Sequence, residues 1–185
     1  MKAKVLRGDI AYDGEPLNSL WAYREHGVQG DSIVAFQGLC DVDVAALVDL
    51  ADAKAGAFIY SKKMLHFIAE HFELDLEAAI LRQYLLVSIA QDELNRHLKA
   101  KRVVRDGNDL YLGKAKLSVS IATLTPVSSK IHFGINIVSA GTPVKTLGLK
   151  DLGINTLAFA NVLIKRYVTD HARMAVARRK VRGVS

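Results

Sequence analysis

The sequence predicts an α+β fold in which helices pack against a mixed or antiparallel sheet. Two long stretches repeat apolar residues at helical spacing, and several short stretches rich in branched and aromatic residues are separated by turn-forming residues. The chain has 185 residues, half of them hydrophobic, which suffices to bury one core without a disulfide or a structural metal. Because no stretch has the composition of an interdomain linker, we expect residues 1–185 to form a single domain.

The first half of the chain predicts two helices and two strands. A short helix is expected over residues 17–25, because Pro16 suits a first helical turn. Strands are expected over residues 31–38 and 63–72, which are rich in branched and aromatic side chains. Residues 75–98 then place apolar side chains along one stripe, and Asp75 is suited to cap this helix.

The second half predicts four strands and a closing helix. The strands cover residues 101–105, 108–113, 116–124 and 130–138, and the turns between them favour one antiparallel meander. An edge strand beside this meander makes a homodimer plausible. Residues 154–179, which follow Gly153, repeat apolar side chains at helical spacing and predict the last helix.

Charge and composition limit the class of protein. The formal net charge is +6, and much of the excess lies in a basic helix end at residues 171–185. We favour a solvated helix end here, with nucleic-acid binding as the less favoured alternative. The N-terminal residues lack the apolar run of a signal peptide, and no segment approaches the roughly 20 apolar residues of a membrane span. We therefore expect a cytoplasmic protein that does not enter a membrane.

A family resemblance is carried by residues 108–121, NDLYLGKAKLSVSI, and by residues 132–138, HFGINIV. The first block resembles the biotin protein ligase pattern of Asn-Asp-Leu/Ile, a variable turn and Lys-Leu/Ile-small-Gly, and also the Lys-Val/Ile-Ser-Gly-Ser of lipoate protein ligases. The second resembles the Gly-Ile-Asn-Val strand of biotin ligases and the His-Gly strand of lipoate and octanoyl transferases. The resemblance implies a sheet of the class II aminoacyl-tRNA synthetase type, in an uncharacterised prokaryotic branch of this superfamily.

The resemblance also implies roles for particular side chains. It places Lys116 beside the carboxylate of a small acid and the phosphate of its adenylate, where a fixed cation stabilises developing negative charge. It places the substrate near Arg105, Asn108, His132, Gly134 and Asn136. Taken without the resemblance, Lys116 is an exposed strand residue, Asn108 a turn residue and His132 a packed one, and these alternatives stay open. By alternation we expect one polar face made of Lys114, Lys116, Ser118 and Ser120.

The chain departs from these families between Cys40 and Met64. Ligases carry an arginine- and glycine-rich adenylate loop there, whereas this segment has no arginine and four aspartates: Asp41, Asp43, Asp49 and Asp52. Phosphate prefers glycine-rich backbone and guanidinium groups, so it stays open whether the protein uses ATP with magnesium as a cofactor. No cysteine follows the His-Gly strand as in octanoyltransferases, and we expect Cys40 to be a buried structural thiol.

No metal centre is expected, because no motif with metal-ligand spacing is found and His66 and His71 fall on opposite faces of one strand. Three function classes remain. The first is an acyl-adenylate-forming or acyl-transferring enzyme that acts on a small carboxylic acid and passes the acyl group to an acceptor protein. The second is a non-catalytic small-ligand-binding module that lacks the adenylate loop, and the third is a basic protein that binds nucleic acid or a partner.

Overall fold

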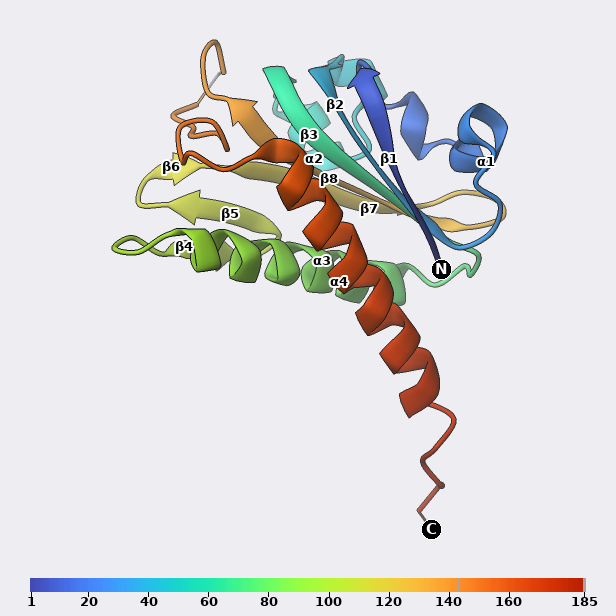
Figure 1. The fold of residues 1–185 in the computed structure, drawn as a ribbon. Coiled ribbons are helices and arrows are strands. Elements are labelled where there is room, and N and C mark those ends of the chain that lie inside the picture. Colours follow the sequence, from blue (N-terminus) through green and yellow to red (C-terminus); the bar gives the residue numbers. More distant parts are fainter. Residues whose placement is uncertain (143, 185) are drawn as a thin grey trace.

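The computed structural model describes residues 1–142 and 144–184, and in it a twisted sheet carries two long helices on one face (Figure 1). The sheet has five strands in the order β1-β2-β3-β8-β7. Its strands are β1 (Lys2–Asp9), β2 (Ser32–Val42), β3 (Ile59–His71), β7 (Ser118–Leu124) and β8 (Ser129–Val138). All neighbours are antiparallel except β1 and β2, which are parallel. The predicted α+β class is confirmed.

Strand β1 has no counterpart in the sequence prediction. It lies at the sheet edge and its side chains are mostly exposed, so its sequence KAKVLRGD lacks the alternation of a half-buried strand. Lysines on an edge strand also oppose pairing with another chain. Its pairing with β2, and no local sequence pattern, identifies this segment as a strand.

The predicted four-stranded meander is wrong, because the chain divides it between two sheets. Strands β4 (Val103–Asp106), β5 (Asp109–Leu112) and β6 (Ala115–Lys116) form a separate small sheet, while β7 and β8 belong to the large one. The division falls at Leu117, which is fully buried and donates its N–H to the carbonyl of Leu110. Polar and apolar residues alternate across this point without interruption, so the sequence contains no signal for the break.

The two long helices agree with the prediction. Helix α3 (Leu76–His97) is capped by Asp75, whose carboxylate accepts the N–H of Ala78 at 2.9 Å. Helix α4 (Thr156–Ala177) is capped in the same way by Asn155. After α4 the residues from 178 to 184 are exposed and have no regular structure apart from a turn. None of the helices in the described residues is long and apolar enough to cross a membrane.

The predicted helix over residues 17–25 is in fact two short helices, η1 (Glu15–Leu17) and α1 (Trp21–His26). They are separated by Leu20, whose φ of 62° is rare for a branched side chain. The carboxylate of Glu70 holds this turn by accepting the Leu20 N–H at 3.0 Å. Two further short helices, η2 (Val44–Ala46) and α2 (Leu50–Lys54), lie between β2 and β3.

Buried apolar residues form two clusters, one on each face of the large sheet. One cluster joins the sheet to α3 and α4 through residues such as Phe67, Phe133 and Leu163. The other lies on the opposite face and includes Tyr12, Trp21, Phe36 and Met64. The long helices cover only the first face, so the second is covered by short helices and loops (Figure 1).

Candidate functional site

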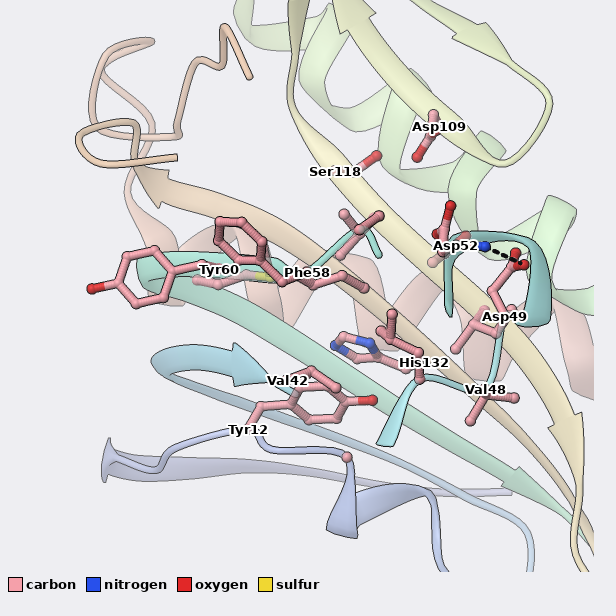
Figure 2. Close-up of a pocket in the computed structure, with 18 of the residues that line it drawn as sticks. Tyr12, Val42, Val48, Asp49, Asp52, Phe58, Tyr60, Asp109, Ser118 and His132 are labelled. Carbon is pink, nitrogen blue, oxygen red and sulfur yellow. Dashed lines mark hydrogen bonds between the residues drawn. The ribbon is translucent and has the colours of Figure 1, made fainter. Parts of the chain in front are cut away.

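A cavity of about 590 Å³ lies on the face of the sheet opposite the long helices. Its floor consists of side chains from β3, β7 and β8, including Met64, Val119 and His132. Its roof is the cover segment, which we define as residues 43–58 between β2 and β3. Figure 2 shows His132 between Tyr12 and Phe58, with Asp49 and Asp52 of the cover segment side by side and Asp109 on a separate strand near Ser118.

The cover segment is thin and only partly buried. Asp49 caps the five-residue helix α2 by accepting the N–H groups of Ala51 and Asp52. Leu50 and Phe58 remain 70% and 55% exposed. An element with so few buried apolar contacts opens at low free-energy cost, which gives a ligand a route into the cavity.

Lys116 lines the cavity and forms an ion pair with Asp109 at 2.7 Å. Its backbone is fixed on both sides, because its N–H donates to the carbonyl of Lys145 and its carbonyl accepts the N–H of Leu147. Burial raises the pKa of Asp109, the Lys116 ammonium opposes this shift, and the charge of Asp52 adds to it. The site therefore places one ammonium next to a carboxylate that takes up a proton more readily than usual.

His132 belongs to a buried stack of aromatic rings. Its ring lies 3.8 Å from that of Tyr12, and its Nε2 is 3.1 Å from Nδ1 of His66. Burial lowers the pKa of His66 to about 3 and that of His132 well below its ordinary value. Both histidines are therefore neutral near pH 7, so His132, the one of the two that lines the cavity, brings no positive charge to an anionic ligand.

Gly134 lies beside this pair without a side chain of its own. A Cβ at this position would overlap Sδ of Met64 and lie 3.3 Å from Nε2 of His132. The missing side chain therefore leaves room for the residues that form the floor. Asn136, two residues further along β8, lines the cavity, and its backbone is held by Leu117 and Leu149.

Asn108 lines the cavity but also has a structural role. Its Nδ2 donates to the carbonyl of Ser120 at 2.9 Å, and the Ser120 hydroxyl donates to the Asn108 carbonyl. Gln83 of α3 donates to the same hydroxyl. These bonds join the small sheet to β7 and fix the position from which Lys116 extends.

Arg105 is not one of the described residues that line the cavity. Its guanidinium donates to the carbonyl of Gly107 and lies 5.1 Å from the ring centroid of Tyr84. Lys114 is also exposed in a turn away from the cavity, whereas Lys116 lines it.

The expected polar face of four residues is wrong. Ser118 and Ser120 pair with Ile135 and Phe133, and Ser120 accepts a hydrogen bond from Gln83 of α3, so both serines lie on the helix side of β7. The alternate residues Val119 and Ile121, which pair with Gly134 and His132, face the cavity, and Lys116 belongs to the separate small sheet.

Several residues of the site were not expected from the sequence. Tyr12 reaches it from a loop that joins β1 to η1, and no local pattern indicates this contact. Asp109 is adjacent to Asn108 and could have been noticed as the partner of Lys116.

Cys40 is fully buried, and burial raises the pKa of its thiol to about 12, so it is un-ionised near pH 7.

The profile of one protein family, described as "Domain of unknown function (DUF366)", matches residues 1–182. The chain belongs to this family. Uncharacterized protein MJ0805 of Methanocaldococcus jannaschii is 42% identical over 164 residues, which are 85% of this chain and 73% of that protein. A solved protein of unknown function from Pyrococcus horikoshi is 35% identical, covers both chains completely and superposes with a TM-score of 0.93.

Solved ligases are similar to the chain at the level of fold. A biotin protein ligase from Aquifex aeolicus matches 92% of this chain and 70% of its own at a TM-score of 0.54 and 14% identity. Ta0514, a putative lipoate protein ligase from T. acidophilum solved with bound lipoic acid, matches 94% and 86% at a TM-score of 0.53 and 12% identity. The ligase-like fold is thereby confirmed, and identities this low show the fold alone.

Proposed function

We propose that this protein binds a small carboxylic acid with an apolar body in the cavity and activates or transfers its acyl group. The observation that carries the proposal is the position of Lys116, whose ammonium stands at an otherwise mainly apolar cavity in a ligase-like fold. It is the only lysine or arginine among the described residues that line this cavity. An acyl chain would lie along the apolar walls, with its carboxylate at the ammonium.

The size and walls of the cavity suit this class of ligand. A volume of about 590 Å³ is within the usual range for small-molecule sites. The side chains of Val42, Phe58, Met64 and Ile121 offer apolar surface to a chain or ring. Lys116 has three N–H donors and spends one on Asp109, which leaves donors for a ligand carboxylate.

Calorimetric titration with octanoate, lipoate and biotin, each alone and with ATP and magnesium, tests the proposal. We expect at least one acid to bind, and Lys116→Met to weaken its binding at least tenfold, because the apolar side chain keeps the length and removes the charge. Lys114→Met is the matched control, since Lys114 lies two residues away in an exposed turn. Equal affinity in both variants, or no binding of any acid, would contradict the proposal.

A proton is expected to bind together with the acid. A ligand carboxylate at Lys116 adds negative charge beside Asp109, whose pKa burial already raises, and so favours its protonated form. The affinity for the acid is therefore expected to increase as the pH falls, down to the pH at which the ligand's own carboxylate takes up a proton. In Asp109→Asn we expect several-fold tighter binding and a weaker pH dependence; weaker binding would show that Asp109 positions Lys116 instead.

A second candidate function is a small-ligand-binding module without catalysis. The cavity that Lys116 lines is also lined by three aspartates: Asp49, Asp52 and Asp109. Their negative charge would repel a nucleoside triphosphate. An enzyme predicts that ATP with magnesium tightens acid binding and that pyrophosphate is released. A binding module predicts acid binding that ATP does not change and no pyrophosphate.

The remaining expectations about partners stay predictions. An acyl-acceptor protein follows only if the enzyme hypothesis holds, and a homodimer is best tested by light scattering. Binding of nucleic acid through the exposed basic residues after α4 would be strongly dependent on salt. Salt-independent acid binding in the cavity separates the proposed function from that alternative.

A further inference from the structure

Three side chains with metal-binding chemistry meet on the face of the sheet that carries the long helices. His71 ends β3, His171 lies in the second half of α4, and Asp31 immediately precedes β2. Each offers one ligand atom, and these atoms lie within 4.8 Å of one another. We call these three residues the histidine cluster. It is separate from the cavity, because His66, five residues before His71, faces the opposite side of the sheet.

His71 has one ring nitrogen that the protein leaves without a partner. The residue is 1% exposed, and its Nε2 is 2.9 Å from the hydroxyl of Tyr167. Its Nδ1 is buried, and within the described part of the chain it has no hydrogen-bond partner. Buried polar atoms in proteins nearly always have a partner. A metal ion is a partner that would satisfy this nitrogen, and Tyr167 would then orient the ring from its other side.

The other two members approach from the solvent side. Nε2 of His171 is 3.7 Å from a carboxylate oxygen of Asp31, and the other oxygen of Asp31 accepts the Phe72 N–H at 2.8 Å. That hydrogen bond fixes the carboxylate beside the end of β3. The side chains of His171 and Asp31 are 19% and 36% exposed, so a bound ion would keep a position open to water.

We propose that Asp31, His71 and His171 bind a divalent first-row transition metal, for which Zn²⁺ is the reference ion. Two imidazoles and one carboxylate are a ligand set that zinc sites with an open position use. Bonds of 2.0–2.1 Å at tetrahedral angles place ligand atoms about 3.3 Å apart. The cluster therefore closes slightly on binding, chiefly by movement of the partly exposed His171 and Asp31.

The charges around the cluster act on a bound cation in opposite directions: the Asp31 carboxylate attracts it, whereas Arg82 and the Met1 amino group repel it. The charge of Arg82 is partly offset by its ion pair with Glu73. Arg82 and the Met1 amino group act with burial to lower the pKa of both His71 and His171, the former to about 3.

A metal at this place would tie three separate segments together. The cluster joins α4 to the end of β3 and to the residue before β2. Tyr167, one turn before His171, is the last buried residue of α4. Beyond this level the helix extends past the sheet (Figure 1). The bound ion would therefore act as a clamp that holds the C-terminal helix to the sheet.

The proposal is tested with full-length protein that carries no histidine tag and has been treated with a chelator. We expect about one equivalent of Zn²⁺ to bind by calorimetry and to raise the melting temperature. We expect Co²⁺ to give visible absorption bands of a site with fewer than six ligands. His171→Gln is expected to weaken Zn²⁺ binding at least tenfold, and Asp31→Asn, which keeps the oxygen that accepts the Phe72 N–H, is expected to do so as well.

His97→Gln is the matched control, because His97 is an exposed histidine of α3 outside the cluster. It is expected to bind Zn²⁺ as the unchanged protein does. Both cluster variants alter partly exposed side chains, and their folding is checked by circular dichroism without metal. Zn²⁺ binding that His171→Gln leaves unchanged, or no binding with a normal fold, would overturn the proposal.

Discussion

The two faces of the large sheet bury different kinds of side chain, although the same strands supply both. Along β8, Ile131, Phe133 and Ile135 point to the long helices and join an apolar cluster with them. The alternate residues face the other side and are polar or small: Lys130, His132, Gly134 and Asn136.

The difference lies in what covers each face. Two 22-residue helices cover the first face and fill it with large apolar side chains. Short helices and the thin cover segment lie over the second face, so polar side chains there remain next to a cavity. Some of these polar groups are structural, since the buried Lys130 pairs with Glu70 at 3.2 Å. The comparison supports our placing of the proposed acid-binding site on the face with the weaker cover.

The largest effect is expected from acid, because neutral histidines are buried on both faces. Burial lowers the pKa of His66 and of His71 to about 3, and that of His132 well below its ordinary value. Below about pH 6.5 the unfolded chain binds protons that the folded chain does not, so stability is complete above pH 6.5 and is lost as the pH falls toward 3. Each histidine contributes a loss of about 1.4 kcal/mol per pH unit in this window.

Urea unfolding in chelator from pH 7.5 to 4.5 measures this slope. His66→Gln is expected to reduce the slope by about one proton, with a lower stability at pH 7.5. An unchanged slope would mean that His66 is already charged in the folded protein, and the neutral pair on the cavity face would be wrong.

Substitutions on the two faces are expected to differ in cost. Phe133→Ala removes a fully buried ring under the helices and is expected to cost about 3–5 kcal/mol of unfolding free energy. Val119→Ala, on the neighbouring strand at the cavity, is expected to cost less than about 1.5 kcal/mol, because the side chain is only partly buried and water can enter. Urea unfolding compares them, and similar costs would show that both faces are packed alike.

Gly134→Ala tests the floor of the cavity. The new methyl group would overlap the Met64 side chain, and we expect a loss of about 1–3 kcal/mol of unfolding free energy. Adding Met64→Ala is expected to offset part of the loss, because it removes the group that the methyl meets. If Gly134→Ala alone is neutral by urea unfolding, Met64 moves freely and the floor is adaptable.

The smallest effect is expected at the basic end of the chain. Residues 178–184 follow α4 and are exposed, so we expect deletion of residues 178–185 to change the unfolding free energy by less than about 0.5 kcal/mol. Deleting residues 164–185 also removes the buried Ile164 and Tyr167, and is expected to unfold the protein. Circular dichroism and thermal melting distinguish the two, and unfolding by the short deletion would show that the tail packs against the body.

Local signals explain what the sequence predicted correctly. Helix α3 begins where Asp75 predicts a cap, because capping depends on atoms three residues apart. The branched and aromatic residues of segment 130–138, which follow a turn-forming segment, likewise predicted β8 as a strand. By contrast, β1 is an exposed edge and the break at Leu117 leaves no local pattern, so both depend on contacts with distant parts of the chain.

The candidate site was predictable only in part for the same reason. The family pattern pointed to Lys116, Asn108, His132 and Asn136, and the fold brings all four to one cavity. It also pointed to Arg105, which instead stabilises its own turn and contacts Tyr84. Tyr12 stacks on His66 and His132, which lie more than 50 positions away in the sequence. The members of the histidine cluster, at positions 31, 71 and 171, are likewise 40 or more positions apart. Such sets become visible only when the strand order is known.

The packing of the last helix against the first strand has a consequence for synthesis of the chain. Helix α4 contacts both β1 and β2, which are made at the other end of the sequence. While the ribosome is still adding α4, the apolar residues of that sheet face remain without their cover. We expect the nascent chain to stay open until α4 has left the ribosome, and to depend on chaperones during that interval.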